Sequence, residues 1–267
     1  MLNTKKSAIW RFFLLCLLCN PTLASAENCP ASLFDESAIV KYVHDGDTVK
    51  LVDGRKIRLI GINAPEVARE DKPAEAFAIS SRDLLRSLLS RHNNHIRLIH
   101  GEENQDHYKR GLSHLFLPDG TNLQAQLLSS GLASAITIPP NQRFSECYQK
   151  IEKQAFCSKK GVWSNKIASV SGLDNKASGF QVLRGKLKKL STSHKDIWLS
   201  LERGLSLRIA SQHKPLFDME RLQSLVGKSV IVKGWLQIKK NPRQDERFYM
   251  QIKHPSSINE EKTALEC

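Results

Sequence analysis

Residues 45–66 read DGDTVKLVDGRKIRLIGINAPE, and this stretch decides the fold of the chain around it. Both halves alternate apolar with polar side chains, the apolar ones being Val49, Leu51, Ile57, Leu59 and Ile62. Asp53-Gly54 stands between the halves, and alternation interrupted by Asp-Gly is typical of a β-hairpin. Because a hairpin brings its ends together, we expect the acidic residues at both ends to converge beside Arg58. Carboxylates beside an arginine suit a metal ion and a phosphate group.

The first 26 residues have the pattern of a secretory signal peptide. Lys5, Lys6 and Arg11 precede an apolar run over residues 12–18, and Ala24-Ser25-Ala26 offers a small-residue cleavage site. We therefore predict cleavage after Ala26 and a secreted or periplasmic protein. The leader is too short for a membrane span, and no later stretch approaches the ~18 apolar residues that a spanning helix needs.

Four of the six cysteines lie beyond this leader, namely Cys29, Cys147, Cys157 and Cys267. An even number in an exported chain suggests disulfides, and four cysteines allow three full pairings. Cys147 and Cys157 lie in one helical pattern, about 15 Å apart along its axis, so an intact helix excludes a bridge between them. Among the remaining pairings we favour a bridge between Cys29 and Cys147.

Composition describes a globular protein with a basic excess. Apolar residues make up 40% and charged residues 25%, while the formal net charge is +13. Residues 27–178 carry a net charge of +2 and residues 179–267 a net charge of +8. The excess favours a polyanionic partner and lies mainly on the C-terminal part. Nothing in the sequence implies a protein partner, so we expect a monomer.

The order of the expected elements predicts two β-rich domains. Strand patterns cover residues 39–43, 48–52, 56–62, 95–100 and 111–117, and helical patterns cover 71–91, 122–130 and 144–159. This order favours an α+β, mainly β domain, in which a small barrel has helices on one side. Further strand patterns cover 180–190, 196–201, 205–210, 230–237 and 248–252, with a helical pattern at 215–225, which is the order of an OB-fold.

We expect the first domain at residues 27–163, a linker at 164–179, the OB-like domain at 180–255 and a frayed polar tail at 256–267. Trp163, Trp198 and Trp235 are expected in the core. Because an OB-fold often binds oligonucleotides, the second domain is a candidate nucleic-acid-binding domain. Its candidate contacts are Lys186, Lys188 and Lys189, for which a solvated strand face is the alternative.

Three motifs carry a resemblance to a known family. They are HDGDTV at 44–49, IRLIGINAPE at 57–66 and DHYKRG at 106–111. Together, in this order and with the same helical pattern between them, they resemble the staphylococcal-nuclease (thermonuclease) family over residues 39–163. The resemblance implies an OB-like five-stranded barrel with three helices. It also implies an endonuclease, or phosphodiesterase, that hydrolyses DNA, RNA or both, typically with Ca²⁺.

The resemblance also implies roles for individual residues. Asp47 matches the metal-binding aspartate, and Glu66 matches the general base. Arg58 and Arg110 match the arginines that hold the scissile phosphate. The second metal ligand, normally aspartate, is Asn63, and the next residue, Ala64, would offer its backbone carbonyl.

Further residues are secondary candidates for the same site. Asp45 either shapes the turn or reaches the metal through water, while Tyr108 and Asp106 are candidates for contacting the substrate or the arginine. The oxygen ligands suit Ca²⁺, with Mg²⁺ or Mn²⁺ as alternatives. Asn63 provides an oxygen but one negative charge less than aspartate, which is expected to lower metal affinity.

Three functional hypotheses follow from these features. The first is an exported metal-dependent nuclease with a C-terminal domain that helps to bind nucleic acid. The alternative is a catalytically weak or inactive nucleic-acid-binding protein on the same scaffold. A third is an envelope-surface module whose basic domain binds an anionic polymer or lipid.

Overall fold

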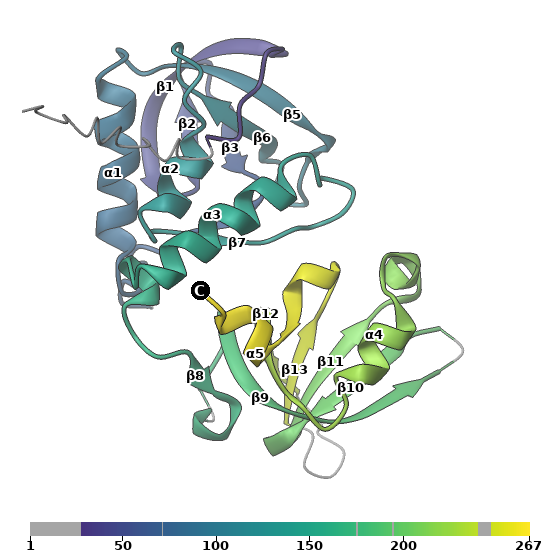
Figure 1. Cartoon of the computed structure of the whole chain (residues 1–267). Coiled ribbons are helices and arrows are strands. Elements are labelled where there is room, and N and C mark those ends of the chain that lie inside the picture. The colour runs from purple at the N-terminus through teal and green to yellow at the C-terminus, as the bar shows by residue number, and fades with distance from the viewer. Residues whose placement is uncertain (1–27, 71, 175, 194, 240–246) are drawn as a thin grey trace, which may run out of the picture.

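Two closed β-barrels follow one another along the chain (Figure 1). This computed structural model describes residues 28–70, 72–174, 176–193, 195–239 and 247–267. The predicted signal peptide and its cleavage site lie outside these residues. Within the described ranges, no helix is long and apolar enough to cross a membrane.

The first barrel is built from five strands in the order β1-β2-β3-β6-β5. Their bounds are β1 Glu36–Asp45, β2 Thr48–Leu51, β3 Lys56–Leu59, β5 His95–Gln105 and β6 Gly111–Phe116. A small two-stranded sheet joins β4 (Ile62–Asn63) to β7 (Ser134–Ala135) beside the barrel. The helices that cover this barrel are α1 Ala78–Ser90, α2 Leu123–Ser129 and α3 Ser145–Cys157, followed by the 3-10 turn η1 Gly161–Trp163.

The predicted hairpin is confirmed as β2 and β3. Thr48 pairs with Arg58 and Val49 with Ile57, while Gly54 adopts the left-handed backbone (φ 94°) that the turn requires. The alternating apolar side chains are almost fully buried in the barrel core. A parallel pairing of β3 with β6 then places Leu112 beside Arg58. Two distant motifs of the sequence therefore lie on neighbouring strands.

The first helix begins later than the sequence pattern predicts. We expected a helix from residue 71, but α1 begins at Ala78, because Phe77 has a left-handed backbone (φ 67°). The preceding residues form a loop closed by its own hydrogen bonds, in which the backbone N–H of Glu75 donates to the Glu66 carbonyl (2.9 Å). This loop holds Glu66 outside any helix or strand.

The second barrel repeats the strand order of the first. Five strands close it in the order β9-β10-β11-β13-β12, with β12 returning to β9. Their bounds are β9 Gly179–Thr192, β10 Ile197–Leu201, β11 Leu205–Ile209, β12 Ser229–Ile238 and β13 Phe248–Gln251. In both barrels the third and fifth strands pair in parallel. The expected mainly β fold, with an OB-like barrel followed by a second barrel, is confirmed.

Shorter elements complete the second half. They are β8 Ala168–Ser169, η2 Val170–Gly172, η3 Glu202–Gly204, η4 Ser211–Leu216, α4 Met219–Ser224, η5 Pro255–Ser257, β14 Ile258–Glu260 and α5 Glu261–Leu265. The helical pattern at 215–225 is therefore divided, because the Asp218 side chain accepts from the backbone N–H groups of Glu220 and Arg221 and starts α4 anew.

Two expectations about the ends of the second domain need correction. The segment 164–179, expected to be a linker, contains β8, and Val170 is buried in the core of the second barrel. The tail from residue 256 onward is not frayed, because β14 pairs with β12 and Ile258 is fully buried. Both segments bury a branched apolar side chain, which fixes them to the barrel.

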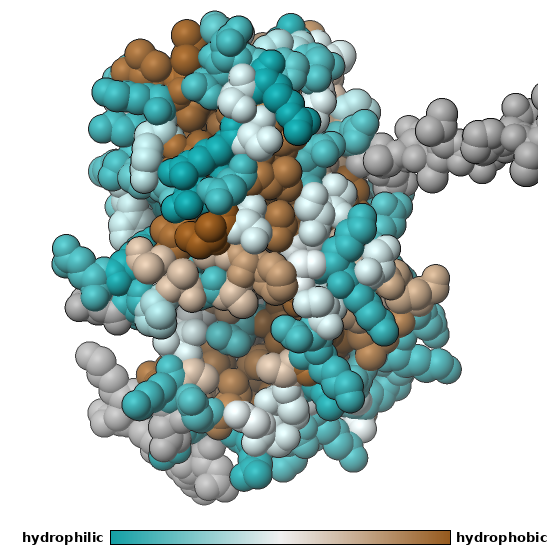
Figure 2. Space-filling view, turned by 90° about the vertical axis from the view of Figure 1, so that its left-hand side faces the viewer, coloured by the Kyte–Doolittle hydropathy of each residue, from teal (hydrophilic) through white to brown (hydrophobic). Residues whose placement is uncertain are grey.

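The two barrels are joined covalently and by an ion pair. A disulfide links Cys157 at the end of α3 to Cys267 at the end of the chain. The Lys233 ammonium on β12 lies 2.5 Å from the Glu152 carboxylate on α3. Figure 2 shows the two barrels in direct contact on the face at the left of Figure 1. The second barrel is thus fixed to α3, the helix that packs against the first.

Candidate active site

Two aspartates lie at the turn between β1 and β2. Asp45 and Asp47 are 6% and 3% exposed, and the Asp47 backbone N–H donates to the Asp45 carboxylate (3.0 Å). The Asp47 carboxylate also accepts from the Thr48 hydroxyl (3.1 Å) and from the backbone N–H of Ala64 (2.6 Å). Asp47 therefore connects the turn between β1 and β2 to the backbone at Ala64, so that the two ends of the motif lie together, as the hairpin geometry predicts.

Arg58 connects these carboxylates to Asn63. Its guanidinium forms an ion pair with the Asp47 carboxylate and donates from Nη2 to Asn63 Oδ1 (3.2 Å). Asn63 is 8% exposed and donates from Nδ2 to the Ala64 carbonyl (3.3 Å). The structure thus brings together Asp45, Asp47, Arg58, Asn63 and Ala64, as the motif pattern predicts.

Burial disfavours the charged form of the Asp47 carboxylate, although Arg58 lies beside it. Burial raises the pKa of Asp47 to about 7; Arg58 opposes this shift and the neighbouring Asp45 carboxylate adds to it. A cation beside these carboxylates would relieve the unfavourable burial. Nearby, the buried Ser81 hydroxyl has no hydrogen-bond partner, and a Cβ at Gly46 would lie 1.9 Å from it.

This donor set fits a hydrated hard cation. It offers two carboxylates, the Asn63 amide oxygen and the Ala64 carbonyl, which are the oxygen ligands that Ca²⁺ prefers. The described residues contain no group of three or more His, Cys, Asp or Glu arranged to hold a metal. With asparagine at position 63, the donor set contains two carboxylates. The sequence analysis did not predict that Ser81 approaches Gly46 closely. The only signal for this contact was the glycine within Asp-Gly-Asp.

Glu66 forms its ion pair and hydrogen bonds with residues of its own loop. Its side chain is 48% exposed and pairs with Arg69 (2.5 Å between Oε2 and Nη2) on the same loop. Its backbone N–H donates to the Glu75 carboxylate (3.1 Å). Among the described residues, the structure pairs the Glu66 carboxylate with neither Arg58 nor Arg110. An exposed ion pair of this kind costs little to open.

Arg110 directly precedes β6 and has its own acidic partner. Its Nε donates to the Asp106 carboxylate (2.8 Å), and its guanidinium lies 5.4 Å from the centre of the Tyr108 ring. The Arg110 side chain is 26% exposed, and Tyr108 is 69% exposed. Arg110 directly precedes Gly111, which is the register partner of Ile57, the residue before Arg58. The two arginines are therefore carried by neighbouring parallel strands, with Arg110 at the entry to β6.

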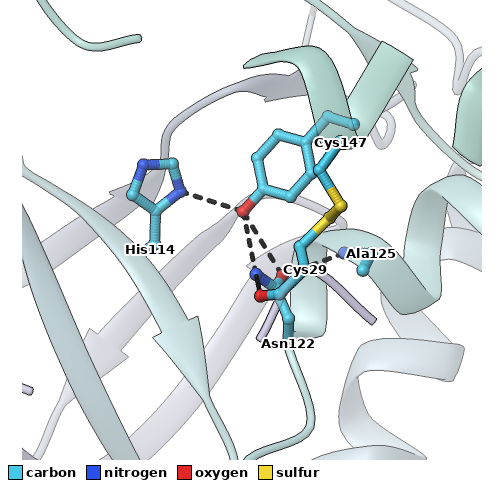
Figure 3. Close-up of a disulfide and its surroundings, with 6 residues drawn as sticks. Cys29, His114, Asn122, Ala125 and Cys147 are labelled. Carbon is cyan, nitrogen blue, oxygen red and sulfur yellow. Dashed lines mark hydrogen bonds between the residues drawn. A yellow bond between two sulfur atoms is a disulfide. The ribbon is translucent and has the colours of Figure 1, made fainter. Parts of the chain in front are cut away.

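A buried hydrogen-bonded cluster holds α3 against the first barrel (Figure 3). The Tyr148 hydroxyl contacts His114 Nδ1 (2.9 Å) and accepts from Asn122 Nδ2 (3.1 Å), beside a disulfide between Cys29 and Cys147. That disulfide is the pairing favoured from the sequence. Burial lowers the pKa of His114 to about 3, so the ring is neutral. His114 is thus a structural residue.

Tyr148 of this cluster also restricts which residue can stand at position 61 of the motif. A Cβ at Gly61 would lie 2.6 Å from the Tyr148 ring, and Gly61 adopts φ 84°. Only glycine allows the helix to pack this closely over the chain that leads to Asn63.

The second-domain candidates lie on a different barrel. Lys186, Lys188 and Lys189 are exposed on β9, alternating with or flanking buried Leu187. Nothing in their contacts assigns them a ligand.

The expectation that three tryptophans lie in the core holds for Trp163, which is 8% exposed, but is wrong for Trp235, which is 38% exposed, and for Trp198, which is half-buried.

Comparison with known proteins identifies relatives of the first half of the chain. Residues 56–165 match the sequence profile of the family described as "Staphylococcal nuclease homologue". A thermonuclease from Staphylococcus intermedius is 30% identical over 131 residues, which cover 48% of this chain and 76% of that protein. One from Staphylococcus hyicus is 32% identical over 127 residues, 46% of this chain and 73% of that protein. The endonuclease YhcR of Bacillus subtilis is 29% identical over 51% of this chain and 12% of its own length.

Proposed function

Because this chain belongs to the staphylococcal nuclease family, we propose that it is a nuclease that hydrolyses phosphodiester bonds of DNA, RNA or both. The observation that carries this proposal is the cluster at the end of the hairpin. There, Arg58 is held between a buried carboxylate and Asn63. Arg110 stands at the entry to β6, the strand that pairs in parallel with the strand of Arg58. Two guanidiniums on neighbouring strands suit a phosphate, since each can pair with two of its oxygens.

Each residue has a definite task in this hydrolysis. Arg58 and Arg110 bind the nonbridging oxygens and stabilise the charge that builds up on the five-coordinate phosphorus. Glu66 takes a proton from the attacking water, whose oxygen forms the new bond to phosphorus. The bond from phosphorus to the sugar oxygen breaks, and that oxygen gains a proton as it leaves. Glu66 reaches the phosphate once its exposed pair with Arg69 opens.

The site is proposed to use a divalent cation held by Asp47, Asn63 and the Ala64 carbonyl, with Asp45 nearby. Ca²⁺ is the first choice, and Mg²⁺ or Mn²⁺ are alternatives. When bound, the cation would supply positive charge to the phosphate in the transition state. The two buried carboxyl groups of Asp45 and Asp47, together with the Asn63 side chain, support this choice.

We also propose that the protein acts outside the cytoplasm, in the periplasm or beyond the cell. The leader pattern of residues 1–26 supports this, and so do the two disulfides, which persist in oxidising compartments. The second barrel, with most of the basic excess, is proposed to help hold the nucleic acid.

A cleavage assay tests the proposal directly. The mature protein is incubated with denatured DNA and with RNA, in Ca²⁺, Mg²⁺, Mn²⁺ or a chelator. Fragments are expected with at least one metal and none with chelator. Binding to nucleic acid without cleavage under every condition would overturn the enzymatic function. It would favour the second candidate, a nucleic-acid-binding protein on the same scaffold.

That second candidate has one specific observation in its favour, the amide at position 63. Asn63→Asp is expected to lower the metal concentration for half-maximal cleavage by at least about tenfold, because ligand charge sets the affinity of such sites. The measurement is a metal titration of the initial rate. Asn94→Asp, which adds the same charge on an exposed turn of the same barrel, serves as the control. Equal shifts in both variants would show that Asn63 is not at the metal.

A further inference from the structure

The outer face of the second barrel contains an aromatic pair that the core does not use. On β10, Ile197, Leu199 and Leu201 point into the core, so Trp198 points outward and is half-buried. On β13, Phe248 and Met250 are buried, so Tyr249 likewise points outward. The ring centres of Trp198 and Tyr249 lie 6.3 Å apart, with their planes tilted by 50°.

The strand β11, which lies between the strands of Trp198 and Tyr249, contributes a positive charge through Arg208 and a small side chain through Ser206. β11 lies between β10 and β13, and its Arg208 is the register partner of Trp198. Tyr249 stands beside Ser206, whose small side chain allows the two rings to approach each other across β11. These strands lie side by side in the lower barrel of Figure 1. The rings and the guanidinium therefore share one surface.

The cation on this surface is held in place yet remains accessible. Arg208 donates from Nε to the Asp196 carboxylate (2.8 Å), while 36% of its side chain is exposed. Lys239 brings a second positive charge, with its Nζ 3.5 Å from the Ser206 hydroxyl. Lys189, on the neighbouring β9, pairs in register with Ser200 and is exposed.

A cavity of about 320 Å³ lies on this surface, and its lining residues are Trp198, Arg208, Gln237, Ile238, Lys239 and Tyr249. This volume lies at the lower end of the range for ligand sites. An apolar ligand would make no use of the positive charges of Arg208 and Lys239, and an anion alone would make no use of the two rings. A base that stacks on an aromatic ring, joined to a phosphate that meets a cation, uses all of these groups.

We propose that the Trp198–Tyr249 face of the second barrel, with Arg208 and Lys239, binds single-stranded nucleic acid by base stacking and phosphate contact. The site rests on the proposed nuclease function and specifies how the second barrel takes part in it. It lies on a different barrel from Arg58 and Arg110, so it acts on the affinity for long strands and leaves the bond-breaking step unchanged. Stacking requires unpaired bases, which makes single strands the preferred substrate.

The test compares variants that keep a ring with variants that remove it. The mature protein is titrated in chelator with a fluorescent long oligothymidylate. Trp198→Leu is expected to weaken binding by roughly 5- to 150-fold, since stacking on one ring is worth about 1–3 kcal/mol per base. Trp198→Phe, which retains a ring, is expected to lose much less. Equal losses in the leucine and phenylalanine variants, or no loss in either, would overturn the stacking site.

Two controls separate stacking from general attraction. Arg208→Met is expected to weaken binding, whereas Arg184→Met is expected not to, although Arg184 is also an ion-paired arginine of this barrel. Inorganic polyphosphate, which has charge but no bases, should bind wild type and Trp198→Leu equally. A selective loss of polyphosphate binding in Trp198→Leu would contradict the proposal.

Kinetics distinguishes this inference from the proposed function. With long single strands, Trp198→Leu should raise KM and leave kcat unchanged, and with a dinucleotide it should match the wild type. If the wild-type protein cleaves no substrate, the nuclease function is overturned. The binding titration, which needs no cleavage, then still tests the stacking site. Cleavage by wild type with unchanged KM in Trp198→Leu would overturn the stacking site alone.

Discussion

Arg110→Ala and Glu66→Gln are each expected to reduce kcat/KM for denatured DNA by about 10²- to 10⁴-fold. Removing a preorganised donor to a transition state typically costs about 10²- to 10³-fold, and removing a general base about 10²- to 10⁴-fold. Both side chains are partly exposed and bonded to neighbouring surface residues, so these variants are expected to fold normally. The measurement is the initial rate at saturating metal, with thermal unfolding monitored in parallel.

Arg58 requires a more conservative change. Arg58→Ala would leave the buried Asp47 carboxylate without its ion-pair partner and would destabilise the barrel. Arg58→Lys keeps the charge but loses the planar fork that pairs with two oxygens at once. We expect Arg58→Lys to lose about 10²-fold in kcat/KM, with a much smaller change in stability.

The same hairpin offers a matched control. Arg55 is 45% exposed and forms ion pairs with Glu36 and Asp53, away from the buried carboxylates. Arg55→Ala is expected to retain wild-type rates, because a surface ion pair contributes little and does not touch the phosphate. Wild-type rates in both Arg110→Ala and Glu66→Gln would show that hydrolysis takes place elsewhere.

Lys233→Met is expected to destabilise the protein by about 3–5 kcal/mol. The Lys233 and Glu152 side chains are only 10% and 12% exposed, and the pair joins β12 of the second barrel to α3, the helix that packs against the first. Methionine keeps much of the packing of the lysine stem but leaves the Glu152 carboxylate buried without its cation. The measurement is the free energy of unfolding in urea with both disulfides intact, monitored by fluorescence and circular dichroism.

Glu152 also connects this pair to the candidate active site. Its Oε1 accepts from the backbone N–H of Ala135 (2.7 Å), and Ala135 pairs with Ile62, the residue before Asn63. The double variant Lys233→Met with Glu152→Gln is expected to recover part of the lost stability. It removes the uncompensated charge and keeps an acceptor for Ala135.

An exposed pair of the same barrel provides the control for this prediction. Lys228 and Glu260 lie 2.8 Å apart but are 44% and 30% exposed. Lys228→Met should therefore cost less than about 1 kcal/mol. A loss in Lys233→Met no greater than that in Lys228→Met would mean that the pair between the barrels does not stabilise the fold.

Local patterns predicted most of the secondary structure, because strand alternation and turn chemistry act over a few residues. The hairpin at Asp53-Gly54 and the two barrels follow from such patterns. The late start of α1 does not follow from local patterns. Phe77 has a left-handed backbone, and the residues before it form a loop that is hydrogen-bonded to Glu66, although their sequence is also compatible with a first helical turn. The outward direction of the Trp198 side chain was also not predicted, because a single tryptophan lies more often in the core than on the surface.

The motif cluster could be predicted from local sequence, since Asp45, Asp47, Arg58 and Asn63 belong to one hairpin and its immediate continuation, where local geometry leaves little choice. The groups that surround this cluster could not be predicted in this way, because they depend on the packing of the whole chain. The orphaned Ser81 hydroxyl beside Gly46 and the bonds from Glu152 to both Lys233 and Ala135 depend on contacts between distant segments. Such contacts arise from the packing of helices and barrels against one another, a long-range effect that leaves no periodic trace in the sequence.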